Sequence, residues 1–258
     1  MSDKTALITG ASSGIGLELS KLFARDSYNL VLVARSTQKL ESLASELRQA
    51  YGVEVTVLTA DLSQPGAARV VFDAVQSQDI EIHTLVNNAG FGIHRPLAET
   101  DPDEIVRMLQ VNMVTLTELT RLFLPGMLRR KSGRILNVGS TGSFSPSPLM
   151  AAYVASKGYV LSLSEGLAEE LRGTGVTVTA LCPGVTRTGF QERAQVGNMP
   201  LVHFGNVSVE KVAAAGYKAL LRGKRWVVPG FANQLMVLSM SLTPHAITLP
   251  IARRIMKK

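Results

Sequence analysis

A tyrosine and a lysine stand four positions apart in the stretch AAYVASKGYV, residues 151–160. Side chains at positions i and i+4 of a helix lie on one face, within reach of each other. A free tyrosine has a pKa of about 10, and a neighbouring positive charge lowers that pKa by stabilising the phenolate. Tyr153 beside Lys157 is therefore a candidate acid or base near neutral pH. The same spacing also fits a solvated pair on a helix surface, so the rest of the chain must decide between the two.

Short β-branched runs alternate with helical patterns along the chain, and several runs are apolar throughout, as in a parallel sheet buried on both faces. Strands are expected at residues 5–9, 29–34, 53–59, 82–87, 134–139, 176–182 and 225–229. Helices are expected at 14–26, 36–50, 64–78, 102–130, 149–172 and 208–222. This order predicts an α/β protein: a doubly wound parallel sheet of about seven strands, or Rossmann fold, in one domain. We expect that domain to span residues 1–230, followed by a C-terminal helical extension over 231–258.

The first expected strand runs into TGASSGIG, residues 9–16, and then into a helix. Glycine permits tight turns and close approach of a ligand, and the free N–H groups of a helix N-terminus suit a pyrophosphate. Gly10, Gly14 and Gly16 follow G-x-x-x-G-x-G rather than the common G-x-G-x-x-G. A plain strand-to-helix turn is the alternative. The position in the first β–α unit favours dinucleotide binding.

The end of the second expected strand indicates which dinucleotide is bound. An NAD site usually carries an acidic residue about twenty residues past the glycines. This chain reads VARST there, with Arg35 and no carboxylate nearby. A guanidinium would pair with the extra phosphate of NADP, which an acid would repel. Arg35 could also be an ordinary exposed arginine, but with the glycines upstream NADP(H) is favoured over NAD(H).

Six motifs, in this order, resemble those of the classical short-chain dehydrogenases/reductases over roughly residues 5–230. They are TGASSGIG (9–16), NNAG (87–90), VN (111–112), Ser140 in VGSTG, YVASK (153–157) and PGVTRT (183–188). The resemblance implies that Tyr153 is the catalytic acid/base and that Lys157 lowers its pKa and holds the nicotinamide ribose. It further implies that Ser140 binds the substrate oxygen and that Asn112 orders a water in the proton relay.

The resemblance also implies a coenzyme site. Asp61 would meet the adenine, Thr188 would hold the nicotinamide carboxamide, and Arg35 and Ser36 would contact the 2′-phosphate. The residues expected at the coenzyme are Gly10, Ser12, Ser13, Gly14, Ile15, Gly16, Arg35, Ser36, Asp61, Leu62, Asn87, Asn88, Ala89, Gly90, Tyr153, Lys157, Pro183, Gly184, Val185 and Thr188.

The expected activity is NADP(H)-dependent hydride transfer between nicotinamide and a carbonyl or alcohol, with an apolar ketone, aldehyde or 3-oxoacyl compound as substrate. An apolar pocket wall, or else ordinary core packing, is indicated by Phe91, Phe144, Phe190, Met199, Leu201, Val202 and Phe204. Two alternatives are an NADP-binding sensor or scaffold without turnover, and an epimerase or dehydratase. The latter enzymes usually carry a larger C-terminal domain, for which this chain has no room.

Composition limits the partners. The net charge is +7, and four cations lie at the extreme C-terminus, so no nucleic-acid partner is expected. The four histidines lack ligand spacing, so no metal site is expected. The single cysteine, Cys182, and an N-terminus without a secretory pattern suit the cytoplasm.

The C-terminal extension has three possible roles. Residues 226–252 contain no Asp, Glu, Lys or Arg, but prolines interrupt them, so a membrane span is not expected. A helix at 231–243 would carry Leu235, Leu238 and Leu242 on one face. It could cover the substrate mouth, pack in a homodimer or homotetramer, or lie peripherally on a membrane. Packing on protein is favoured over membrane contact.

Overall fold

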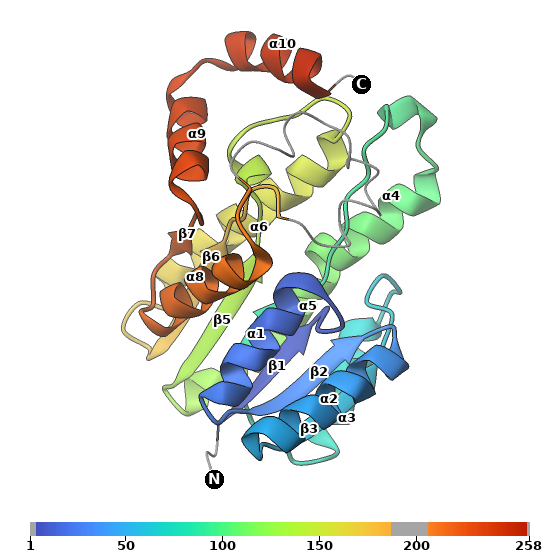
Figure 1. The fold of residues 1–258 in the computed structure, drawn as a ribbon, viewed down its shortest axis with the longest axis vertical. Helices are drawn as coiled ribbons and strands as arrows, with labels where there is room; N and C mark the ends of the chain where they lie inside the picture. Colours follow the sequence, from blue (N-terminus) through green and yellow to red (C-terminus); the bar gives the residue numbers. More distant parts are fainter. Residues whose placement is uncertain (1–3, 187–205, 257–258) are drawn as a thin grey trace.

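The computed structural model describes residues 4–186 and 206–256, and every structural statement below refers to those residues. Its centre is a seven-stranded sheet in the order β3-β2-β1-β4-β5-β6-β7, in which every neighbouring pair is parallel (Figure 1). The strands are β1 (Thr5–Thr9), β2 (Asn29–Ala34), β3 (Val55–Thr59), β4 (Ile82–Asn87), β5 (Gly133–Val138), β6 (Val176–Leu181) and β7 (Trp226–Val227).

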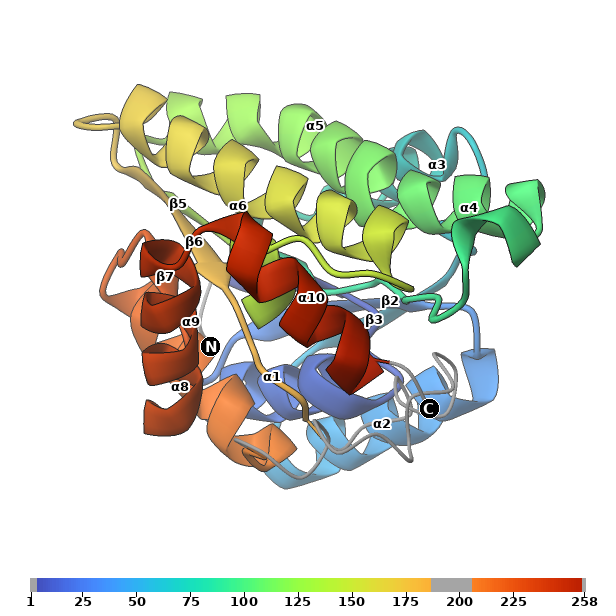
Figure 2. The same ribbon diagram turned by 90° about the horizontal axis from the view of Figure 1, so that it is seen from above.

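Helices cover both faces of this sheet, as the view from above shows (Figure 2). One layer consists of α1 (Gly14–Arg25), α2 (Thr37–Tyr51) and α8 (Val209–Leu221). The other consists of α3 (Ala67–Gln76), α4 (Pro102–Leu109), α5 (Leu116–Arg129) and α6 (Ala151–Glu170). Short helical turns η1 (Leu97–Glu99) and η3 (Thr141–Phe144) lie in the connections. The doubly wound single domain expected from the sequence is confirmed.

The apolar residues of the strands explain why helices pack on both faces of the sheet. Every residue of β1 is buried, because helices pack on both of its faces. On the α1 side, the ring of Phe23 is fully buried and meets Tyr28 and Tyr217 edge to face. Burying a side chain of this size contributes about 1.5–3 kcal/mol, and such contacts hold α1 and α8 against the sheet.

Most expected boundaries differ from the structure by a residue or more, and the last expected strand, 225–229, is reduced to Trp226–Val227. The third strand begins at Val55 rather than residue 53. The helix expected at 64–78 begins at Ala67, after Gly66 with φ of +80°. The helix expected at 102–130 is interrupted by a π-helical segment, η2 (Gln110–Thr115). Such wider turns are frequently found at functional sites.

The connections of β1 create the place for a ligand. The chain leaves β1 toward β2 on one side, and β4 pairs with β1 on the other. Open α/β sheets bind ligands at this switch point, outside the carboxyl ends of the strands. The glycine turn, the NNAG motif and Ser140 follow β1, β4 and β5, so all three lie at this edge.

Two C-terminal helices complete the fold. Helix α9 (Phe231–Leu242) follows β7 and contacts η3, and α10 (His245–Met256) crosses above the carboxyl edge of the sheet (Figures 1 and 2). The buried amide of Asn233 donates to Pro229 O at 2.8 Å and fixes the start of α9. At the far end, His94 Nε2 lies 3.2 Å from Met256 O. No helix in the described ranges is long and apolar enough to cross a bilayer.

The turn between α6 and β6 gives a prediction about stability. Gly173 and Gly175 both have positive φ, +81° and +84°, which costs an L-residue about 1–2 kcal/mol. A Cβ at Gly173 would meet nothing within 4 Å, whereas one at Gly175 would lie 1.9 Å from Lys131 O. Gly175→Ala should therefore lower the free energy of unfolding in urea well beyond the loss in the matched control Gly173→Ala. Equal losses would contradict the clash.

Candidate active site

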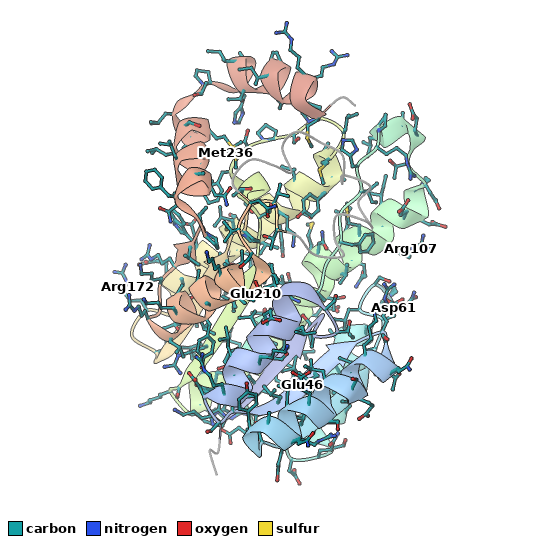
Figure 3. The ribbon with its side chains drawn as sticks, in the orientation of Figure 1. Glu46, Asp61, Arg107, Arg172, Glu210 and Met236 are labelled. Carbon is teal, nitrogen blue, oxygen red and sulfur yellow. The ribbon has the colours of Figure 1, made fainter. Side chains whose placement is uncertain are left out.

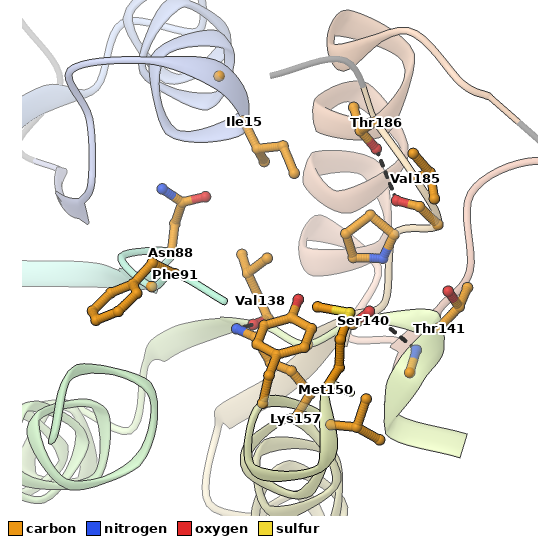
Figure 4. A pocket seen from close by; sticks show the side chains of 18 of the residues that line it. Ile15, Asn88, Phe91, Val138, Ser140, Thr141, Met150, Lys157, Val185 and Thr186 are labelled. Atoms are coloured by element: carbon orange, nitrogen blue, oxygen red, sulfur yellow. Dashed lines mark hydrogen bonds between the residues drawn. The ribbon is translucent and has the colours of Figure 1, made fainter. Parts of the chain in front are cut away.

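A cavity of about 1140 Å³ lies at the carboxyl ends of the strands. Its walls come from the loops after β1 to β6, from the start of α6, and from α9 and α10. Asp61, after β3, and Met236, on α9, are labelled in Figure 3 and mark two distant parts of its lining. Figure 4 shows how side chains from separate elements converge on it.

The glycine turn forms one wall and allows close backbone approach. Gly10 and Gly14 have φ of +66° and +57°. A Cβ on Gly10 would lie 2.8 Å from Asn88 Nδ2, and one on Gly16 would lie 2.4 Å from Gly10 O. Glycine is required at all three positions. Gly10 and Gly14 need its backbone conformation, and Gly16 must lack a Cβ in order to pack against Gly10. Gly16 itself does not line the cavity, so its expected role at the coenzyme is indirect.

Asn88 ties this turn to the neighbouring strand. Its Nδ2 donates to Thr9 O at 2.8 Å and to Gly10 O at 3.2 Å. The backbone N–H groups of Asn88 and Ala89 donate to Thr9 Oγ1 at 2.9 and 3.0 Å. Asn87 was expected to line the coenzyme, but it does not line the cavity. Its buried amide points into the core and donates to Thr120 and Asn137.

The turn and the N-terminus of α1 fit a dinucleotide pyrophosphate. Ser12, Ser13, Gly14 and Ile15 line the cavity. The N-cap Ser13 is extended and its side chain makes no capping hydrogen bond. The first N–H groups of α1 therefore face the cavity together with the positive end of the helix dipole.

Positive charge lies where β2 ends. Arg35, Ser36 and Lys39 all line the cavity, and the N-cap Ser36 makes no side-chain capping bond. Asp61 lies close by. Burial raises the pKa of Asp61, but hydrogen bonds with Ser63 and Gln64 and attraction by Arg35 outweigh this and lower it overall. Lys39 was not foreseen, although its place four residues after Arg35 was a usable signal.

The helix α6 brings the expected catalytic side chains together. Lys157 Nζ lies 5.9 Å from the centre of the Tyr153 ring and donates to Val138 O, at the end of β5, at 2.8 Å. Tyr153 is hydrogen-bonded to Ser140. Ser140 is the N-cap of η3, and its Oγ accepts from Gly142 N at 3.0 Å. Both Tyr153 and Lys157 are buried, so the alternative of a solvated surface pair is wrong.

Burial sets the protonation of this group. It raises the pKa of Tyr153 to about 12, and the hydrogen bond with Ser140 offsets this only in part. The lowered pKa expected from the sequence is therefore wrong in direction, because loss of water around the phenol dominates. Burial also lowers the pKa of Lys157 to about 8. Near pH 7 the pair consists of a phenol and an ammonium, which are both proton donors.

Asn112 lies behind this pair, on the π-helical segment η2. Its Nδ2 donates to Phe91 O and to Ser156 Oγ, both at 3.0 Å, and its Oδ1 accepts from Phe91 N at 3.2 Å. A Cβ on Gly90 would meet Asn112 Oδ1 at 2.8 Å and Lys157 Nζ at 3.5 Å. Gly90 is therefore required for η2 to pack closely behind the lysine.

The sequence predicted only some of the residues that line the substrate end of the cavity. Phe91 lines the cavity as expected, but Phe144 does not, because its ring packs edge to face on Trp226. The cavity lining that was not expected includes Thr141, Met150, Val154, Thr186, Met236, Ser239, Met240, Thr243, Thr248, Ile251, Ala252 and Met256. The expected residues Thr188, Phe190, Met199, Leu201, Val202 and Phe204 lie outside the described residues.

Two further features concern metal ligands and the thiol. No group of three or more potential metal ligands occurs within residues 4–186 and 206–256. Cys182 is fully buried, and burial raises the pKa of its thiol to about 12. The thiol therefore stays protonated and is a poor nucleophile.

Comparison with known proteins identifies the family. A model of the short chain dehydrogenase family matches residues 4–198. Very-long-chain 3-oxoacyl-CoA reductases from Anas platyrhynchos and Phaeosphaeria nodorum are 37% and 36% identical to this chain. The alignments cover 69% and 67% of this chain, but only 58% and 52% of those relatives.

Solved structures agree with this assignment. A short-chain dehydrogenase from Sphingobium yanoikuyae in complex with NADPH is 34% identical over 92% of both chains, with a TM-score of 0.83. A 7beta-hydroxysteroid dehydrogenase is 28% identical over 97% of this chain and 96% of its own, with a TM-score of 0.88. A relative from Burkholderia phymatum in complex with NAD is 27% identical over 94% and 93%, with a TM-score of 0.82. The chain therefore belongs to the short chain dehydrogenases, a family of oxidoreductases.

Proposed function

We propose that this protein is an NADPH-dependent reductase of a carbonyl group in an apolar substrate. The observation that carries the proposal is the convergence of Ser140, Tyr153 and Lys157 beside the glycine turn, in one cavity. A bound nicotinamide supplies the hydride. Ser140, Tyr153 and Lys157 position the substrate and supply the proton.

The residues act in a simple order. Ser140 and Tyr153 hold the carbonyl oxygen by hydrogen bonds, and the phenol protonates that oxygen as its negative charge develops. The Lys157 ammonium, held by Val138 O, stabilises the phenolate that remains. The same bond fixes the ammonium 5.9 Å from the centre of the Tyr153 ring. Return of the proton runs past Asn112 toward solvent.

The coenzyme preference rests on charge. Arg35 and Lys39 line the end of the cavity beyond β2, where the adenosine ribose would lie. Two cations favour a phosphate on that ribose over a hydroxyl. This supports NADP(H) over NAD(H).

The substrate class rests on the opposite end of the cavity. Met236, Met240 and Met256 line it there, and methionine side chains adapt to apolar ligands of irregular shape. Together with the names of the curated relatives, this supports a 3-oxoacyl thioester or a bulky apolar ketone.

A chain-length series tests this substrate class. Each buried methylene contributes about 0.8 kcal/mol, or about fourfold in kcat/KM, until the cavity is filled. NADPH absorbance with 3-oxoacyl thioesters of increasing length measures the trend. No dependence on length would contradict an apolar acyl site. No reduction of any carbonyl, with NADPH still bound, would favour a sensor or scaffold.

Removing the phenol tests the catalytic assignment. Tyr153→Phe should lower kcat by about 10²–10⁴-fold, since the proton donor is lost. NADPH binding, measured by fluorescence titration, should persist. The matched control is Tyr159→Phe on the same helix, where the hydroxyl bonds only Thr117 among the contacts described. Equal activity of the two variants would refute the role of Tyr153.

The pH profile tests the role of Lys157. Its ammonium is present below its pKa of about 8 and is lost as the pH rises through that value. For reduction, kcat/KM should therefore fall about tenfold per pH unit above this point. NADPH affinity measured over the same range separates weak binding from slow chemistry. A profile that stays flat to pH 10 would contradict a charged lysine in the reaction.

Arg35→Ala tests the coenzyme preference. A hydrogen bond to a charged group contributes roughly 1.5–3 kcal/mol, so NADPH binding should weaken about ten- to a hundredfold. NADH binding should stay nearly unchanged. Arg107→Ala is the control, because that exposed arginine of α4 does not line the cavity (Figure 3). Parallel losses for both coenzymes would rule out a phosphate contact.

A further inference from the structure

The outer face of α9 is an apolar stripe that stays exposed among the residues that the structure describes. Phe231, Leu235, Leu238 and Leu242 occupy positions i, i+4, i+7 and i+11, so they share one side of the helix. They are 81%, 56%, 56% and 77% exposed. Met236 and Met240 line the cavity from the opposite side of the same helix. The stripe therefore has no role in the cavity or in the core.

Helix α10 continues this pattern and adds charge. Ile247 and Ile251 are 53% and 52% exposed, and Arg254 shares their face at i+7. On the other side of α10, Thr248, Ala252 and Met256 line the cavity. Both C-terminal helices thus have an inner face on the cavity and an outer apolar face.

The charge of this segment is entirely positive. Residues 226–258 contain no Asp or Glu, and they end with Arg253, Arg254, Lys257 and Lys258. An exposed apolar helix face beside clustered cations is the pattern of helices that lie in the interface of an anionic membrane.

We propose that the outer faces of α9 and α10 dock this protein on the surface of a membrane containing anionic lipid. A second copy of the chain is the competing occupant. A twofold contact would place the same face of both copies together. Two faces of like charge would then be apposed, and neither would offer a carboxylate of residues 226–258 to the cations of the other. Lipid phosphates supply the missing negative charge. The proposal goes beyond carbonyl reduction and does not depend on it.

Docking would also place the cavity beside the lipid. Ile251 is both half exposed on the outer face and part of the cavity lining. An apolar molecule could therefore pass from the membrane to the cavity along this rim with little exposure to water.

Vesicle flotation of the full chain tests the proposal. The protein should float with phosphatidylcholine vesicles that contain phosphatidylglycerol, at low salt, and much less with phosphatidylcholine alone. Leu235→Glu/Leu242→Glu should abolish flotation. Val70→Glu is the matched control, because Val70 is a 64% exposed apolar residue of α3 away from this face.

Arg253→Gln/Arg254→Gln should weaken binding about 25-fold, at about fivefold per charge. Thermal melting followed by circular dichroism verifies that each variant is folded.

Two results would overturn the proposal. One is wild-type protein that does not float with anionic vesicles at low salt. The other is a dimer or tetramer, seen by sedimentation velocity, that Leu235→Glu/Leu242→Glu dissociates and Val70→Glu does not. The face would then be a contact between copies of the chain.

Discussion

Burial of the Lys157 ammonium beneath Tyr153 is the constraint on which the candidate site depends. A charge out of water needs a fixed acceptor, and Val138 O at the end of β5 provides it at 2.8 Å. That bond requires α6 to lie against β5, and Ser143 Oγ, which donates to Lys157 O at 2.7 Å, holds η3 on the same helix. Ser140 is thereby brought to the phenol. The fold, the serine turn and the lysine form one connected unit.

The coenzyme end of the cavity depends on a different constraint, close contact between backbones. Gly10 and Gly16 lie so close to Asn88 that neither position has room for a Cβ. This contact fixes α1 at the switch point of the sheet and aims its N-terminus at the cavity. Arg35, which lines the cavity just after β2, is the residue that we propose to discriminate between the coenzymes by its charge. The residues proposed for coenzyme binding and those proposed for proton transfer thus lie on separate elements that meet in the cavity.

Local features of the sequence predicted the sheet and the glycine turn, but not which residues of α9 and α10 line the cavity. Apolar runs and glycine spacing act over a few residues, so they can be recognised without the fold. The sequence could not show which of Asn87 and Asn88 faces the cavity. Adjacent residues at a strand end point in opposite directions, so only one of the two can do so. Phe144 lies on a short turn, and only Trp226, far along the chain, decides where its ring packs. The pKa of Tyr153 was misjudged because spacing shows a neighbour but does not show burial.

The central claim is that Tyr153 is a protonated donor near neutral pH. The most direct test is NMR of protein in which the five tyrosines carry ¹³C at Cζ, with Tyr153→Phe used to assign its signal. A pKa of about 12 predicts that the Tyr153 signal keeps its phenol shift up to at least about pH 10. A phenolate that forms near pH 7 would contradict the account.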